Sequence, residues 1–326
     1  MKRFLWFAIF PLFLPSYVTA CQYVTVRDAC FTEKRDMHRL CVIARKDDPE
    51  GQRIHTELRR WLHDEGTGFN AELFYESPDD PDVKWQNYGM PYAPPSSPVT
   101  VFSGYHELGN RKFYIRHWEP GPKLEDLAEL LTSPLREKIR AELLSKMAVF
   151  LYVPGTENGQ ARQIVDEAAR RWSEKEKQGV SVLQVDRSDP AERILLSFMA
   201  IRDPGPEWTA VIFGRGKMMP PVVGDDITEA ELDRQLETLV GECTCLRAAA
   251  SFGVDLPMIW DATQDAQIVP LRSPEDALLA GAGAPADPPP SSNMTPVSVL
   301  YTLVALFSVV LLTSLAILLI RIRSIR

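Results

Sequence analysis

The chain has 326 residues and a formal net charge of −8 at pH 7. Such an acidic balance offers no basic surface to a nucleic-acid backbone, so we expect no nucleic-acid partner. Five cysteines are too few for a dense disulfide framework, and the fold must therefore rest on hydrophobic cores.

The N-terminus has the pattern of an export signal. Lys2 and Arg3 precede an apolar run over residues 4–14, and small residues follow up to Ala20. A basic start, a short apolar middle and a small residue at the cleavage position are typical of a signal peptide. We expect residues 1–20 to be removed and the rest of the body to be exported.

Cys21 follows directly and has three interpretations. The run Val18-Thr19-Ala20-Cys21 is similar to a bacterial lipobox, which makes Cys21 a candidate lipidation site. Ordinary cleavage after Ala20 fits the same residues, and Cys21 is also available for a disulfide bond. Two membrane signals reinforce each other, so a lipid is compatible with a second anchor.

Two stretches of the chain repeat one order of predicted elements: strand, amphipathic helix, strand, short helix or loop, two strands and a helix. In the first half the elements cover residues 38–44, 51–61, 69–75, 99–102, 112–118 and 124–131. In the second half they cover residues 147–153, 159–172, 180–185, 210–213, 218–223 and 229–240. Each half therefore predicts an α/β domain whose mixed sheet ends in an antiparallel hairpin.

Segments outside the repeat complete the domain organisation. Residues 22–26 predict an additional N-terminal strand of the first half, and residues 135–146 predict a connecting helix. The expected parts are domain 1 over residues 21–132, a connection over 133–146, domain 2 over 147–247 and an extension over 248–280. The extension either packs back on domain 2 or begins a stalk.

The C-terminal end predicts a membrane anchor. Residues 281–296 are rich in proline, alanine and glycine, which is typical of an unfolded stalk. Residues 297–320 are uncharged, and about 20 apolar residues suffice to cross a bilayer as a helix. Residues 321–326 are basic and should stay in the cytoplasm. We therefore expect a single-pass protein of the cytoplasmic membrane with its body outside.

The second half, over residues 148–240, resembles the thioredoxin-like fold. The resemblance rests on the strand 149–153, the helix after Gly159 and the pair 210–213 and 218–223 around the turn 214–217. The first half resembles the same fold more loosely. The expected fold class is thus α/β, with two tandem thioredoxin-like domains and a C-terminal transmembrane helix.

The sequence departs from the redox-active members of that family. They carry a Cys-x-x-Cys pair where the helix after the first central strand begins, and the helix dipole lowers a thiol pKa there. The corresponding loops, residues 46–51 and 154–159, contain no cysteine. The family also has a cis-proline opposite that pair, and Pro98 is the candidate in the first half. Trp208 stands near the equivalent position of the second half.

The remaining cysteines leave several alternatives open. Cys243 and Cys245 are a candidate redox, disulfide or metal pair, and the alternative is a structural bridge or two packed thiols. Cys30 and Cys41 flank a polar turn and are candidates for a structural disulfide with each other or with that pair. No two histidines have the i, i+4 spacing of a helical zinc site, so we name no metal ligands.

A long aromatic and proline-rich insertion precedes Pro98. It contains the candidate binding-loop residues Trp85, Tyr88 and Tyr92. Such loops at the end of a rigid sheet often form binding surfaces, and the alternative is an ordinary packed loop.

Two functions from different classes follow. The first is a non-enzymatic, membrane-anchored scaffold that holds a protein partner on redox-inactive thioredoxin-like domains, without a cofactor. The second is a thiol-disulfide oxidoreductase or metal-handling protein that uses Cys243 and Cys245. The absence of cysteine from both helix starts favours the first.

Overall fold

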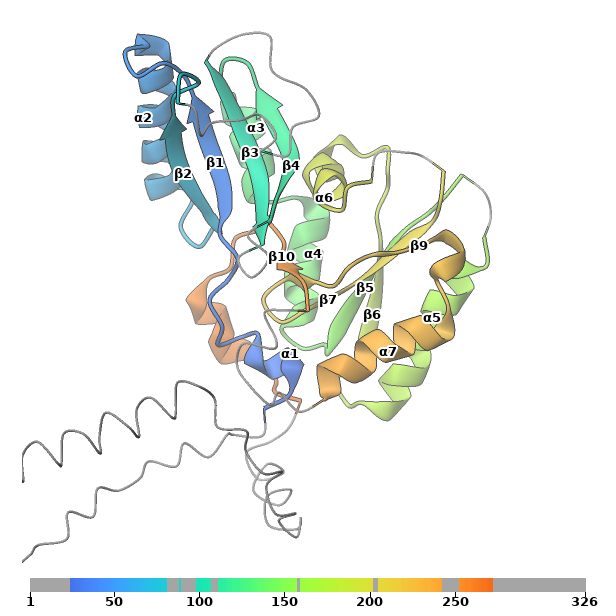
Figure 1. Cartoon of the computed structure of the whole chain (residues 1–326). Coiled ribbons are helices and arrows are strands. Elements are labelled where there is room, and N and C mark those ends of the chain that lie inside the picture. The colour runs from blue at the N-terminus through green and yellow to red at the C-terminus, as the bar shows by residue number, and fades with distance from the viewer. Residues whose placement is uncertain are drawn as a thin grey trace, which may run out of the picture. The chain divides into compact units, whose positions relative to one another are not determined.

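The computed structural model contains two mixed β-sheets with helices packed against them (Figure 1). It describes residues 24–80, 88, 98–106, 111–156, 159–201, 205–241 and 252–271. The expected signal peptide, stalk and basic tail lie outside these residues. The described parts belong to one compact unit.

The first sheet has the strand order β2-β1-β3-β4, with β1 and β2 parallel and the other pairs antiparallel. In the register, Leu40 of β1 lies opposite Leu73 of β2 and Phe102 of β3. The elements are β1 (His38–Ile43), α2 (Pro49–Asp64), β2 (Ala71–Glu76), β3 (Val99–His106), β4 (Arg111–Trp118) and α3 (Leu124–Leu131).

Helix α2 illustrates how the sequence specifies these elements. The Asp48 carboxylate accepts hydrogen bonds from the amides of Glu50 and Gly51, which caps the helix before Pro49 at its first turn. Ile54, Leu58 and Trp61 recur at helical spacing and are buried. That apolar face covers one side of the sheet.

The second sheet has the order β10-β8-β7-β5-β6, with β9 paired to β7. Strands β5 and β6 are parallel, and β7 is antiparallel to β5. The elements are α4 (Pro134–Leu143), β5 (Ala148–Val153), α5 (Ala161–Lys175), β6 (Val180–Gln184), η2 (Pro190–Glu192), α6 (Arg193–Phe198), β7 (Trp208–Phe213), β8 (Lys217–Met218), β9 (Val222–Val223), η3 (Gly224–Asp226) and α7 (Glu229–Val240).

Both halves have the topology of a thioredoxin-like fold: a parallel strand–helix–strand unit, then an antiparallel hairpin and a final helix. The expected connecting helix is α4. The predicted hairpin turn at residues 214–217 is also confirmed, since it joins β7 to β8. Gly214 and Gly216 have φ of 58° and 95° there, and Gly214 lies against the Cys30 side chain, so both features favour glycine.

The core is continuous between the two halves. Leu40 and Val42 of β1 share one hydrophobic cluster with Leu151 and Ile212 of the second sheet. The Phe198 ring of α6 lies 5.3 Å from the Phe113 ring of β4, centroid to centroid. The opposite face of the second sheet packs against α5 and α7, which lie side by side (Figure 1).

The N-terminal strand expected over residues 22–26 is wrong in the described part. Residues Val26–Ala29 form a short helix, α1, because the Thr25 hydroxyl accepts from the Asp28 amide and starts a helical turn. The Val26 amide donates to the Gly241 carbonyl over 3.1 Å, so α1 is tied to the second half and not to the first sheet.

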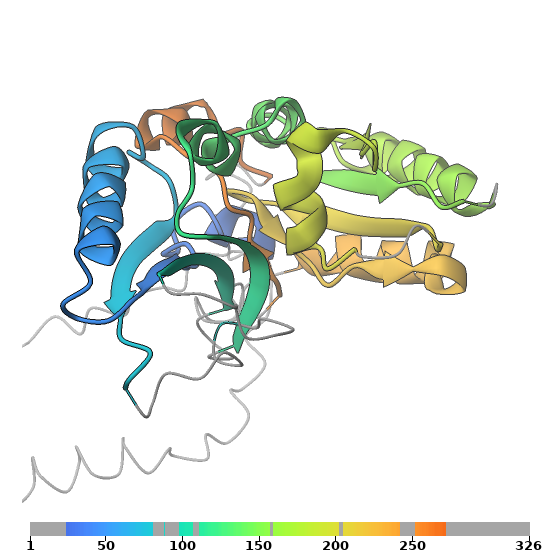
Figure 2. The ribbon, with the colours of Figure 1, turned by 90° about the horizontal axis from the view of Figure 1, so that it is seen from above.

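The C-terminal extension packs against both halves. Val254–Asp255 forms β10, which pairs with β8, and Ile259 makes a β-bridge with Phe69 of the first half. A final turn, η4, covers Ala262–Gln267. Figure 2 shows this segment in dark orange, with β10 at the edge of the second sheet. We call residues 252–271 the strap.

The fold class needs one correction. In the ranges that the structure describes, no helix has the length and apolar character needed to cross a bilayer. The transmembrane helix expected over residues 297–320 lies outside the described residues. Over the described residues the fold class is therefore mixed α/β with two sheets.

Candidate binding site

A groove of about 600 Å³ lies where the second half would keep a thioredoxin-like cysteine pair. We call it the α5 groove. The start of α5 forms one wall, the segment before β7 forms another, and the turn after β9 forms the third. Its lining residues are Thr156, Gly159, Gln160, Ala161, Ile164, Gly205, Pro206, Glu207, Gly224, Asp225, Ile227 and Thr228.

Backbone hydrogen bonds fix the three walls. The Thr156 amide donates to the Gly205 carbonyl over 3.0 Å, which joins the loop before α5 to the segment before β7. The Gly224 amide donates to the Glu207 carbonyl over 2.9 Å, which adds the turn after β9. The groove is thus built from rigid element ends.

The Glu207 carboxylate is the main charged group of the groove. It accepts a hydrogen bond from the Tyr152 hydroxyl and occupies the space beside Gly159, where a Cβ atom would overlap it. Burial and this bond raise the pKa of Tyr152 to about 12, so the phenol stays protonated at neutral pH. Gln160, the residue before α5, makes no side-chain cap, so the first amides of α5 are not occupied by its side chain. A negatively charged group in the groove would face the positive end of the helix dipole.

The first half has a shallower counterpart. Lys46, Asp47, Ser77, Asp79 and Asp80 line a depression of about 380 Å³ beside the start of α2. The amides of that helix start are already capped by Asp48. Neither helix start carries a thiol, and no cluster of three or more candidate metal ligands occurs among the residues described.

The candidate disulfide between Cys30 and Cys41 is not formed, and the alternative bonds to Cys243 or Cys245 fall outside the described residues. Both side chains are buried and are not bonded to each other. Cys41 points to the face of β1 opposite Leu40 and packs with Val99 and Tyr88, whereas Cys30 ends α1 and packs with the core of the second half. The short α1 turns the chain away before β1 begins. Burial raises the pKa of the Cys41 thiol, which makes it unreactive.

The other candidate site residues fall into two groups. Tyr88 is 2% exposed, donates its hydroxyl to Glu76 and accepts at its carbonyl from Ser103, so it is a core residue and not a binding-loop contact. Trp85, Tyr92, Cys21, Cys243 and Cys245 lie outside the described residues, as does Ser97, so the cis bond at Pro98 stays a prediction.

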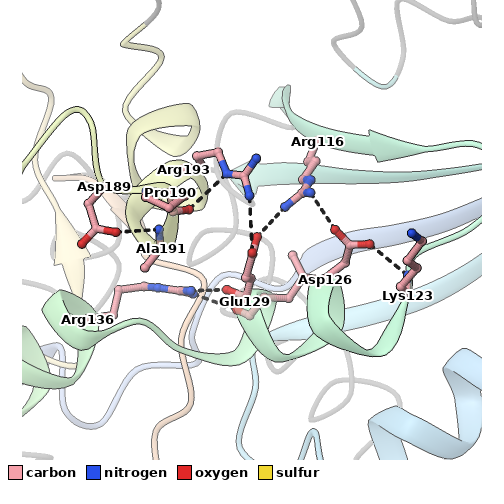
Figure 3. Close-up of polar contacts among 10 residues, drawn as sticks. Arg116, Lys123, Asp126, Glu129, Arg136, Asp189, Pro190, Ala191 and Arg193 are labelled. Carbon is pink, nitrogen blue, oxygen red and sulfur yellow. Dashed lines mark hydrogen bonds and ion pairs between the residues drawn. The ribbon is translucent and has the colours of Figure 1, made fainter.

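Sequence reasoning missed the polar network that joins the two halves. Arg116 of β4 contacts Asp126 over 2.6 Å and Glu129 over 2.7 Å, and Arg193 of α6 reaches Glu129 over 3.4 Å (Figure 3). The Arg136 guanidinium also donates to the Glu129 carbonyl. Arginines from three elements therefore converge on one glutamate.

A second, deeply buried charge cluster includes Asp255 of the strap. Lys217 is 3% exposed, and its Nζ atom lies 3.2 Å from Asp36 Oδ2 and 3.1 Å from Asp255 Oδ2. Burial alone would lower the pKa of Lys217, but the two carboxylates outweigh it and raise the pKa. One lysine thus links the first half, β8 and the strap.

His38 lies beside this group and is fully buried. Its Nδ1 atom accepts from the Tyr105 amide over 3.2 Å, so Nε2 carries the proton and donates to the Asp255 carbonyl over 2.8 Å. Burial lowers the pKa of His38 to about 4. In the sequence, the signal for His38 and Lys217 is a polar side chain at the start of an apolar strand.

Comparisons with known proteins add little. No protein-family model and no curated protein matches the chain. Among solved structures, the N-terminal domain of alkylhydroperoxide reductase AhpF from Enterococcus faecalis is 16% identical, with a TM-score of 0.23, and the match covers 64% of this chain and 94% of that chain. A mutant form of AhpF from the same organism is also 16% identical, with a TM-score of 0.23, and the match covers 64% of this chain and 93% of that chain. Likeness at this level supports no functional argument.

Proposed function

We propose that the chain is a non-enzymatic binding or scaffold protein, which holds a segment of a partner polypeptide in the α5 groove. The observation that carries the proposal is the composition of this groove. It has the position of a thioredoxin-like active site and three fixed walls, but residues 154–160 contain no cysteine. The groove offers carboxylates and backbone groups, which suit recognition and not thiol exchange.

The connection between the two halves supports a scaffold role. A continuous apolar cluster, the Glu129 network and the strap hold both thioredoxin-like halves together. A binding surface on such a body is presented in a fixed geometry, which reduces the entropy lost on binding.

We also propose that the protein works outside the cytoplasm, at the membrane. Support comes only from the sequence: the signal-peptide pattern of residues 1–20 and the uncharged run 297–320, both outside the described residues. Membrane fractionation and protease treatment of spheroplasts would test this location. Recovery of the intact chain in the soluble cytoplasmic fraction would refute it.

Site-specific cross-linking tests the binding function. A photoreactive amino acid at Gln160, which is exposed in the α5 groove, should capture a partner polypeptide in cells. The matched control places the same amino acid at Glu174, which is exposed at the far end of α5. Equal capture from both positions, or none from Gln160, would contradict a binding site in the groove.

A further inference from the structure

A second groove of about 660 Å³ lies on the other side of the turn Gly224–Asp226. We call it the β9 groove. The segment Met219–Val223 forms one wall, and α7 forms the other. Phe252, at the start of the strap, closes one end. The groove combines an apolar floor with acidic groups, and three separate observations on it point to one kind of ligand.

The first observation is an unpartnered buried acceptor. Gln235 is 4% exposed, and its Nε2 atom donates to Glu231 Oε1 over 3.1 Å and lies 3.4 Å from the Pro220 carbonyl oxygen. Two acceptors on that side fix which end of the amide is nitrogen. The Oε1 atom has no hydrogen-bond partner among the residues described. A buried acceptor of this kind favours a ligand that supplies an N–H group.

The second observation is an open strand edge. In the described part of the chain, β9 pairs with β7 alone. The Gly224 amide points to β7, where it donates to the Glu207 carbonyl. Backbone groups alternate in an antiparallel pair, so those of Val223, a lining residue of the groove, point away from β7. An extended peptide can add to an edge of this kind.

The third observation is the charge of the groove. Asp225, Asp226 and Glu231 line it together with a single basic residue, Arg234. The Arg234 guanidinium is already engaged, because it contacts Glu231 Oε1 over 2.6 Å. The groove therefore keeps an excess of negative charge, which complements a cationic ligand.

We propose that the β9 groove binds an extended basic segment of a partner protein. The segment adds beside Val223, gives an N–H donor to Gln235 Oε1 and places lysine or arginine side chains near Asp225 and Asp226. This site adjoins the α5 groove, with which it shares Asp225 and Thr228, and its proposal does not depend on the function proposed for that groove.

Fluorescence anisotropy with a labelled peptide of alternating lysine and threonine tests the proposal on the full chain in detergent. The peptide should bind in low salt and weaken as salt is raised, and its glutamate-for-lysine counterpart should not bind. Gln235→Leu should weaken binding about tenfold, because the buried acceptor is lost. Asp226→Asn, which lies outside the α5 groove, should weaken it less, and the control Glu174→Gln should leave it unchanged.

Several outcomes would overturn the proposal. They are equal binding of the acidic peptide, no binding of the basic one, or full affinity in both Gln235→Leu and Asp226→Asn. A self-association that Asp226→Asn abolishes would show instead that a second copy of the chain occupies the groove. Melting temperatures of both variants establish that they are folded, so weakened binding cannot be attributed to unfolding.

Discussion

Asp36 and Asp255, which are 219 positions apart in the chain, cap each other's backbone. The Asp36 amide donates to Asp255 Oδ2 over 2.8 Å, and the Asp255 amide donates to Asp36 Oδ2 over 3.0 Å. Lys217 contacts the same two carboxylate oxygens. The approach to β1 and the strap are thus joined by a buried cluster of two carboxylates and one ammonium group, which fixes how the halves meet.

Removal of the lysine from this cluster should be strongly destabilising. Lys217→Met leaves two buried carboxylates without a cation, so we expect a loss of about 3–5 kcal/mol in the free energy of unfolding. Chemical denaturation measures it. The control Lys177→Met changes an exposed lysine and should stay within about 0.5 kcal/mol of the parent. Equal stability of the two variants would show that the cluster contributes nothing.

Acid should weaken the fold through His38. The pKa of His38 is about 4 when it is folded and about 6.5 in the unfolded chain, so between these values only the unfolded state binds the proton. The contribution of neutral His38 to the free energy of unfolding is complete above pH 6.5 and falls by up to about 3 kcal/mol as the pH drops to 4.

Unfolding curves over this pH range for the parent and for His38→Gln measure that contribution. The variant should lose most of the slope between pH 6.5 and 4, because the titrating ring is gone. His63→Gln is the control, since its side chain is 86% exposed and should leave the slope unchanged. A parent slope that persists in His38→Gln would assign the acid sensitivity to other groups.

The strap should loosen when Arg136 is removed. The Arg136 guanidinium donates to the Leu130 carbonyl over 2.7 Å and the Pro257 carbonyl over 2.6 Å, and it is 1% exposed. In Arg136→Met these buried carbonyls lose their donor, so amide hydrogen exchange over residues 254–260 should accelerate. Arg140→Met, on the same helix but partly exposed, should leave exchange there as in the parent. Unchanged exchange in both variants would contradict the role given to Arg136.

The state of Cys30 and Cys41 can be read by alkylation and peptide mapping. In the native protein both thiols should resist labelling, because they are buried and the thiolate of Cys41 is disfavoured. In denaturant without reductant Cys41 should label fully, and no disulfide should link the Cys30 and Cys41 peptides. If labelling requires a reductant and the Cys30 and Cys41 peptides are linked, the two residues do form a disulfide.

A change inside the α5 groove should affect binding more than stability. In Gly159→Ala the new methyl group displaces the flexible Glu207 carboxylate and breaks its bond with Tyr152. We expect weaker cross-linking from the groove with a melting temperature within a few degrees of the parent. Glu174→Ala, at the exposed far end of the same helix and outside the groove, is the control and should leave cross-linking unchanged.

The repeat, the order of elements along the chain and the hairpin at residues 214–217 could be predicted because hydrophobic periodicity and glycine turns are local signals. The positions of Cys30, Tyr88 and Lys217 could not. Each depends on partners that are distant along the chain, such as the strap. The short segment before β1 has only a weak preference for helix or strand, and the Thr25 cap decides that residues Val26–Ala29 form a helix. The empty helix starts, in contrast, were visible in the sequence.

In the proposed function the α5 groove binds a partner without thiol chemistry. Cross-linking from Gln160 in a chain that also carries Cys243→Ser and Cys245→Ser gives a direct test of this binding mode. We predict the same captured polypeptide, in the same amount, with and without reductant. Capture that disappears in the serine variant, or that is lost when reductant is present before irradiation, would show that the cysteines and not the groove make the contact.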